Sequence, residues 1–340
     1  MADSTPDPTT AGRTVLVVLD RPDRGLRSPA RELLTIARDL GEVTAFAIAE
    51  PSQDALAELG AYGVGHVLVA DIVGDSADAH LAHLTPVAAE ALVAAVASTG
   101  ADVVLLSSSF LNREVGAHLA HAIGAGLVLD TSAVSVGEQG LVGDKRVFAG
   151  SWDVSCAVTT AAAVVTVRAN AVVAAPAAEP VVVQVDRIDI HPSAAATATV
   201  LVSRTEHAQP EGGSGRPALA EAAYVVAGGR GTLGDFAPVE DLADALGAAV
   251  GATRDAVDEG WVTHDAQIGQ TGVTIAPRVY IGAGISGAPH HRGGMQASGV
   301  IIAVNNDPDS PIFEIADFGV VGDLAEVLPQ AAQAIRAHRG

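Results

Sequence analysis

The chain has one cysteine, Cys156, and only 3% of its residues are aromatic. A single cysteine excludes an internal disulfide and a cysteine-based zinc site, which fits a reducing compartment. The scarcity of aromatic residues leaves few platforms on which single-stranded nucleic acid could stack. Basic residues are also scarce, because 19 Lys and Arg stand against 40 Asp and Glu, for a net charge of −21. A phosphate backbone needs a basic face, so we expect no nucleic-acid partner.

Long uninterrupted apolar runs are missing as well. The most membrane-like stretch, residues 157–178, is rich in Ala, Val and Thr but contains Arg168 and Pro176. It therefore predicts two short strands rather than one spanning helix. The N-terminal stretch MADSTPDPTTAGR has no long apolar core and is not rich in Arg. We expect residues 1–12 to be a disordered tail rather than a signal or transit peptide, and the protein to be cytoplasmic and not inserted in a membrane.

The chain does contain enough apolar material for buried cores. Hydrophobic residues make up 49% of its 340 residues, and this length exceeds the usual size of a single core. Two domains are therefore expected. Residues 206–216 are polar and rich in Gly and Pro, with HAQPEGGSGR at their centre, and they mark the clearest boundary. We predict an N-terminal domain over 13–205, a linker over 206–218 and a C-terminal domain over 219–340.

Apolar runs of strand length alternate with helix-like segments in the first part of the chain. We expect strands at 14–20, 43–49, 66–71 and 102–107, and helices at 28–41 (capped by Ser28), 53–60, 86–99 and 112–124. Strands that are apolar on both faces and alternate with helices indicate a parallel sheet covered on both sides. After residue 127, short β-like runs at 147–149, 154–160, 163–167 and 181–185 have no helices between them, so we expect an antiparallel addition to this domain.

The second domain repeats the alternation of strands and helices. We expect strands at 222–227, 248–252, 278–282, 299–304 and 313–316, and helices at 239–246, 254–259, 289–297 and 323–338. The fold class is therefore α/β with two doubly wound, Rossmann- or flavodoxin-like domains. In such sheets the ligand crevice lies beyond the carboxyl ends of the strands. Residues 228–231, 251–254 and 284–287, with Asn305 and Asp317, all follow predicted strands.

Two of these turns carry an arginine. Residues 228–231 (GGRG) combine glycines, which permit close backbone approach, with Arg230, which can pair with a phosphate or stack on a ring. A plain tight turn explains them equally well, and they lack the GxGxxG pattern of a nicotinamide site. In residues 251–254 (GATR), Thr253 can cap a helix. Arg254 lies in the first helical turn, where a cation is unfavourable with respect to the helix dipole, so we expect it to have a role other than stabilising the helix.

Two further motifs offer hydrogen-bonding groups. Residues 269–272 (GQTG) form a turn or present donors to a planar heterocycle. In residues 286–291 (SGAPHH), Ser286 and Pro289 are ordinary helix-start signals, but free N–H groups there would also suit a pyrophosphate. Adjacent histidines point about 100° apart on a helix and rarely share a metal ion. The HLAH pairs at 80–83 and 118–121 lack accompanying carboxylates or cysteines, so we expect no metal site.

Together these motifs resemble the alpha subunit of electron transfer flavoprotein. The resemblance is dense from Tyr224 to Leu328, in GGRG, VGATRDAVDEGW, IGQTG, APRVYIGAGISGAPHH and VNNDPDSPIFEIADFGVVGDL, and looser over residues 15–200. It implies a subunit that pairs with a β subunit through its N-terminal domain, carries FAD in its C-terminal domain and leaves AMP to the β subunit. It implies an electron carrier of fatty acid β-oxidation rather than an enzyme. Flavin dehydrogenases such as acyl-CoA dehydrogenases would donate electrons, and a membrane quinone oxidoreductase would accept them.

The resemblance also assigns residues to the cofactor. The cofactor-binding set that it implies is Arg230, Thr253, Arg254, Ile268, Gly269, Gln270, Thr271, Ser286, Gly287, Ala288, Pro289, His290, His291, Asn305, Asp323 and Leu324. In this set Arg254 lies over the flavin ring, Thr271 near its N5 and His291 near its C2 carbonyl. A cation beside the N1–C2=O edge stabilises the charge that reduction brings there, so Arg254 and His291 are expected to tune the potential. Pro289, His290 and Asn306 depart from the family's usual residues, and Pro289 has no backbone N–H for a phosphate.

Two other functions stay open at the level of sequence. One is an enzyme that reduces its own small substrate through the flavin, which turnover without a protein acceptor would indicate. The other is a flavin-independent regulatory module that binds an adenine nucleotide on the same fold. No catalytic acid, base or nucleophile pattern stands out, since the serines at 107–109 lack the GxSxG of a hydrolase elbow. This favours the carrier.

Overall fold

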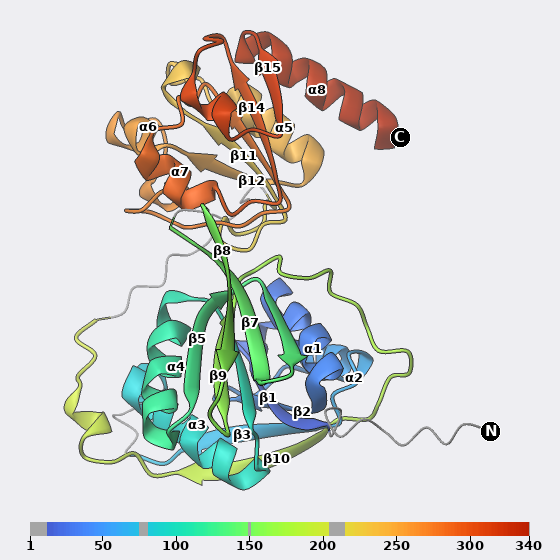
Figure 1. The fold of residues 1–340 in the computed structure, drawn as a ribbon, viewed down its shortest axis with the longest axis vertical. Helices are drawn as coiled ribbons and strands as arrows, with labels where there is room; N and C mark the ends of the chain where they lie inside the picture. Colours follow the sequence, from blue (N-terminus) through green and yellow to red (C-terminus); the bar gives the residue numbers. More distant parts are fainter. Residues whose placement is uncertain (1–11, 75–80, 149–150, 204–214, 340) are drawn as a thin grey trace. The chain divides into compact units, whose positions relative to one another are not determined.

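The structure is a computed structural model of the chain that describes residues 12–74, 81–148, 151–203 and 215–339. Almost all of the predicted tail (1–12) and most of the predicted linker (206–218) lie outside these residues. The chain divides into two compact units. The first comprises Met1–Lys145 and Val154–Glu206, and the second comprises Arg146–Asp153 and His207–Gly340. Each unit is built around its own parallel sheet (Figure 1).

The first unit contains a seven-stranded parallel sheet in the order β10-β3-β2-β1-β4-β9-β5. Its strands are β1 (Arg13–Val18), β2 (Gly41–Ala47), β3 (His66–Ile72), β4 (Val103–Ser107), β5 (Gly126–Thr131), β9 (Ala163–Val167) and β10 (Gln184–Ile190). Helices α1 (Ser28–Leu40) and α2 (Gln53–Ala61) pack on one face, and α3 (Thr85–Thr99) and α4 (Phe110–Ile123) pack on the other. Burial on both faces explains why these strands read as continuous apolar runs.

The antiparallel addition is a separate three-stranded sheet, β6-β7-β8. It consists of β6 (Ala133–Gly137), β7 (Gly140–Val147) and β8 (Trp152–Val158). The assignment of residues 163–167 to this addition was wrong, because β9 lies parallel between β4 and β5 with all five residues buried. The run predicted at 181–185 was also misplaced, since β10 starts at Gln184 and pairs in parallel with β3. Within residues 157–178, β8 ends, β9 follows and no helix forms, as predicted.

The second unit holds a five-stranded parallel sheet in the order β12-β11-β13-β14-β15. Its strands are β11 (Tyr224–Gly228), β12 (Ala249–Ala252), β13 (Val279–Ala283), β14 (Val300–Asn305) and β15 (Phe318–Val321). Its helices are α5 (Ala237–Leu246), α6 (Arg254–Asp258), α7 (Pro289–Met295) and α8 (Leu324–Arg339). Helices α5 and α8 pack on one face, and α7 packs on the other. The predicted fold class, two doubly wound α/β domains with an antiparallel addition to the first, is confirmed.

Three local predictions in the two units need correction. The expected strand at 313–316 is instead the end of a 3₁₀ helix, η8 (Pro311–Glu314), which follows from Pro311 at its first position and the bond from Phe313 N to Ser310 O at 3.1 Å. Asp317 consequently precedes β15 rather than following a strand. In α1 the N-cap is Arg27, and Ser28 is the first helical residue.

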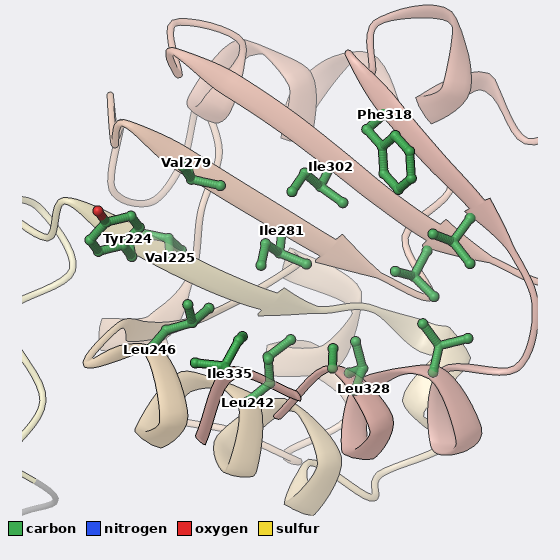
Figure 2. A pocket seen from close by; sticks show the side chains of 14 residues that line it. Tyr224, Val225, Leu242, Leu246, Val279, Ile281, Ile302, Phe318, Leu328 and Ile335 are labelled. Atoms are coloured by element: carbon green, nitrogen blue, oxygen red, sulfur yellow. The ribbon is translucent and has the colours of Figure 1, made fainter. Parts of the chain in front are cut away.

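An apolar cleft of about 340 Å³ separates part of the second sheet from α5 and α8 (Figure 2). Its walls are Tyr224, Val225, Leu242, Leu246, Val279, Ile281, Ile302, Val304, Phe318, Val320, Val327, Leu328, Ala331 and Ile335. Tyr224, Val279 and Phe318 are the first residues of β11, β13 and β15, so one end of the cleft lies at the amino edge of the sheet. In the described part of the chain, no helix combines the length and apolarity needed to span a membrane.

Candidate cofactor site

The strand order of the second sheet reverses between β11 and β13, so its crevice lies at the carboxyl ends of these two strands. Two glycine-bearing loops meet there in backbone contact. Gly231 N donates to Gly284 O at 3.0 Å, and Gly229 N donates to Ala283 O at 3.1 Å. A Cβ on Gly231 would lie 2.6 Å from Gly284 Cα, which is closer than real Cβ contacts allow. Glycine is therefore required at this position for the two loops to meet.

Two arginines reach this crevice from the ends of neighbouring strands. Arg254 begins α6, and Thr253 caps that helix by accepting from Ala256 N at 3.5 Å, as predicted. The Arg254 Nε atom lies 3.2 Å from an oxygen of Asp258 on the next turn. Arg230 follows β11, and its Nε lies 3.1 Å from an oxygen of Asp255. Both arginine side chains are exposed, at 70% for Arg230 and 65% for Arg254, and each is paired only with an exposed carboxylate in these two contacts.

A pocket of about 200 Å³ opens beside Arg254. Its lining residues are Arg254, Gln267, Ile268, Gly269, Gln270, Thr271, His290 and His291. Seven of them belong to the set implied by the resemblance, and Gln267 was missed. Gln267 is 3% exposed, and its amide donates to the Thr271 hydroxyl at 2.9 Å. Its place directly before the IGQTG motif is the one sign that the sequence gives of it, and its burial becomes visible only in the structure.

Residues 267–271, called the pocket loop below, are fixed against their neighbours by backbone hydrogen bonds. Ile268 N donates to Ala252 O at 2.9 Å, which ties the loop to the end of β12. Gln270 N donates to His290 O at 3.1 Å, which ties it to α7. A Cβ on Gly294 would lie 2.4 Å from Gly269 N, so α7 and the loop touch backbone to backbone. The Gln270 and Thr271 side chains are therefore held in place from both sides.

His291 is 6% exposed, and both of its ring nitrogens have partners. Its Nδ1 lies 3.2 Å from Ile268 O, and its Nε2 lies 2.7 Å from the Tyr280 hydroxyl. Burial lowers the pKa of His291 to about 4, against a smaller opposing effect of the bond to Ile268. This direction favours the neutral imidazole at neutral pH, whereas the sequence analysis expected a cation at this position. Arg254 is the lining residue that carries a guanidinium.

The remaining predicted residues lie along the same carboxyl edge, outside this pocket. Asn305, 9% exposed at the end of β14, donates to Ile285 O at 3.0 Å and to the Ser310 hydroxyl at 3.1 Å. Ser286, Gly287 and Ala288 form the loop before α7, where Gly287 has φ +83° and Ala288 is the N-cap. Pro289 is the first residue of α7, Asp323 accepts from Ala325 N at 2.9 Å at the start of α8, and Leu324 is buried in the core.

The switch point of the first unit is filled by its own side chains. It lies between β1 and β4, where Asp20 accepts from Asn112 Nδ2 at 3.0 and 3.1 Å and from the Ser107 hydroxyl. This closed polar cluster follows from Asp20 and Ser107 lying near the ends of adjacent strands. Within residues 12–74, 81–148, 151–203 and 215–339, no three His, Cys, Asp or Glu side chains gather as a metal site would require. His80 of the first HLAH pair lies outside these ranges.

Comparisons with known proteins agree with this geometry. Residues 15–193 match the model of the electron transfer flavoprotein domain, and residues 218–296 match that of the electron transfer flavoprotein FAD-binding domain. The electron transfer flavoprotein subunit alpha of Mycobacterium leprae is 43% identical over 332 residues, covering 96% of this chain and 99% of the relative. Those of Syntrophomonas wolfei and Bacillus subtilis are 34% and 32% identical, covering 92% and 94% of this chain and 96% of each relative. The resemblance and its cofactor, FAD, are thus confirmed, and the chain belongs to the electron transfer flavoprotein alpha-subunit family.

Proposed function

We propose that this chain is the FAD-carrying subunit of a cytoplasmic, heterodimeric electron carrier. In this proposal residues 13–205 meet the β subunit, which holds AMP, and residues 219–340 hold FAD. Flavin dehydrogenases, acyl-CoA dehydrogenases among them, supply the electrons, and a membrane quinone oxidoreductase receives them. The observation that supports it most directly is the pocket that places Arg254 beside Gln270, Thr271 and His291 at the carboxyl edge of the sheet.

The groups around the pocket fit a flat ring whose edge is rich in nitrogen and oxygen. Gln270 offers an amide, Thr271 a hydroxyl and Arg254 a guanidinium, while Ile268 provides an apolar wall that is 1% exposed. FAD supplies the electron chemistry when it is bound. The chain's own part is to bind the ring, to orient it and to place one positive charge near it. No nucleophile paired with a base is needed for these tasks.

The loops at the ends of β11, β12, β13, β14 and β15 suit the phosphates and the adenosine half. Arg230 and Thr253 offer a cation and a hydroxyl beside the glycine contact between the loops. The turn from Ser286 to Ala288 presents backbone N–H groups ahead of α7, although Pro289 offers none. Asn305, Asp323 and Leu324 follow along the edge, where Asn305 orders the turn that an adenosine would meet.

The direct test is to purify the chain with its β partner from co-expression. A flavin absorption spectrum with about one FAD per heterodimer is expected. A colourless complex that takes up no FAD on titration would overturn the proposal. Steady reduction of a small substrate without any protein acceptor would indicate an enzyme instead, and binding of an adenine nucleotide without flavin would indicate a regulatory module.

Arg254→Ala tests the role of the positive charge. A unit charge about 4 Å away contributes about 1 kcal/mol in surroundings like water. A tenfold change, about 1.4 kcal/mol, corresponds to about 59 mV for one electron. We therefore expect the flavin potential to fall by some tens of millivolts in a spectroelectrochemical titration. Arg336→Ala is the matched control, because Arg336 is also exposed and paired, with Asp241 at 2.6 Å, and does not line the pocket. Equal potentials for both variants would remove Arg254 from this role.

A further inference from the structure

Tyr280 is a fully buried tyrosine in an otherwise aliphatic strand. It is the second residue of β13, and its ring lies against the core on the face covered by α7. The glycine two residues later makes room for it, because a Cβ on Gly282 would lie 2.9 Å from Tyr280 Cε1 and 3.1 Å from its hydroxyl oxygen. A buried hydroxyl without a hydrogen-bond partner destabilises a fold, so the Tyr280 hydroxyl is expected to have a partner in the core.

The partner of this hydroxyl is His291 Nε2, at 2.7 Å. The two ring centroids lie 6.0 Å apart with planes tilted by 53°, so the rings meet through the hydrogen bond and not through stacking. On the other side of the imidazole, Nδ1 faces the carbonyl oxygen of Ile268 at 3.2 Å. Ile268 itself lines the cofactor pocket. The imidazole therefore connects the core of the sheet to the pocket wall.

The partners of the imidazole define where its proton lies. A carbonyl oxygen can only accept, so Nδ1 must carry the hydrogen in this bond. Nε2 of the neutral ring then has a lone pair, and the Tyr280 hydroxyl must donate to it. Both bonds run in one direction, from Tyr280 to His291 and from His291 to Ile268. Reversing the tautomer would place two lone pairs against each other at Ile268.

We propose that Tyr280 is a positioning residue of the cofactor site: its hydroxyl donates to His291 Nε2 and holds the imidazole in the orientation in which Nδ1–H bonds the carbonyl of Ile268, which fixes the pocket loop there. The part that concerns the flavin rests on the function proposed above. In this role Tyr280 touches neither cofactor nor partner protein. With both ring nitrogens engaged in these bonds, the imidazole presents neither a lone pair nor a second proton to the pocket that Arg254 lines.

The test uses the full chain in complex with its β partner, labelled with ¹⁵N in histidine. His291 is assigned from the signals that disappear in His291→Gln. We expect the Nδ1 of His291 to be protonated and Nε2 to be unprotonated at neutral pH. A ring protonated at Nε2 only, or at both nitrogens, would overturn the proposal, and this measurement needs no variant of Tyr280 and no bound flavin.

Tyr280→Phe then removes only the hydroxyl and keeps the ring that fills the core. We expect the Nε2 resonance of His291 to shift and the FAD dissociation constant to rise by about two- to tenfold, the usual effect of losing one hydrogen bond. Tyr224→Phe is the control, since it removes a tyrosine hydroxyl from the amino edge of the same sheet and should change neither quantity. An unchanged His291 spectrum and FAD affinity in Tyr280→Phe would refute the role of Tyr280. A complex that binds no FAD would refute the proposed function, whereas the Nε2 resonance of His291 in Tyr280→Phe would still decide on the role of Tyr280.

Discussion

The neutral state of His291 makes the stability of the second unit depend on pH in a defined direction. An unfolded histidine has a pKa of 6.5, whereas burial lowers the pKa of His291 to about 4 in the folded chain. As the pH falls from 6.5 toward 4, the unfolded chain takes up a proton that the folded chain does not, so stability is lost as the pH falls. The interval is about 2.5 pH units, and each is worth about 1.36 kcal/mol, so His291 should contribute about 3 kcal/mol that is present above pH 6.5.

The assay is urea unfolding followed by the fluorescence of Trp261, which packs against the core of the second unit. Trp152, the other tryptophan, is 65% exposed and is replaced by Phe in all variants. Between about pH 7 and about pH 4.5, the chain with His291 should lose about 2 to 3 kcal/mol more than His291→Gln. The control is His264→Gln, because His264 is exposed. This variant should lose as much unfolding free energy between the two pH values as the chain that keeps both histidines. Equal losses with and without His291 would refute the reasoning, because every other titrating group is shared.

Three further substitutions test the packing. Gly231→Ala should destabilise the second unit by roughly 1–3 kcal/mol and reduce FAD retention, because its Cβ would lie 2.6 Å from Gly284 Cα in the neighbouring loop. The control is Gly65→Ala, whose Cβ meets open space and which should leave the unfolding free energy in urea titrations unchanged. Leu328→Ala removes a side chain that is 1% exposed and should cost about 2–5 kcal/mol in the same measurement, and a loss below about 1 kcal/mol would contradict its core position. Asp20→Ala removes the carboxylate that accepts from the buried Asn112 amide and from the Ser107 hydroxyl, and leaves the amide only the Ser107 oxygen at 2.9 Å. It should lower the calorimetric midpoint of the first unit by an amount equivalent to about 1–3 kcal/mol, so an unchanged midpoint would argue against the polar cluster.

Much of the fold could be predicted because local signals and tertiary packing agree. The alternation of apolar runs with helical segments predicted both parallel sheets, and Thr253 was correctly identified as a helix cap. The direction of β9 could not be predicted in the same way. Its residues AVVTV suit a buried strand of either direction, and only the path of the preceding chain places it parallel to β4. The strand predicted at 313–316 was wrong for another reason. Pro311 and the bond from Phe313 N to Ser310 O start a 3₁₀ turn, and this turn buries Ile312 without a strand.

The charge state of the site was the least predictable property. A histidine next to a glycine-rich turn gives no sign of its burial, and the sequence favoured a cation at His291. The decisive partner, Tyr280, lies in the preceding strand, and it becomes visible only when that strand is packed against α7. A signal did exist in the sequence, since a tyrosine in an aliphatic strand with Gly282 two residues later indicates a buried hydroxyl that needs a partner.

Two exposed arginines lie at the carboxyl edge of the second sheet, although the chain has a net charge of −21. Each is held by a carboxylate on α6, Arg230 by Asp255 at 3.1 Å and Arg254 by Asp258 at 3.2 Å. Exposed ion pairs of this kind contribute about 0–1 kcal/mol, so little free energy is needed to release them. In the function proposed above, the acidic partners would therefore keep both guanidinium groups near the crevice and give them up to a phosphate or a reduced ring at little cost. In the function proposed above, the low pKa of His291 leaves Arg254 as the cation that lines the pocket, so the effect of Arg254→Ala on the flavin potential tests the charge of that pocket directly.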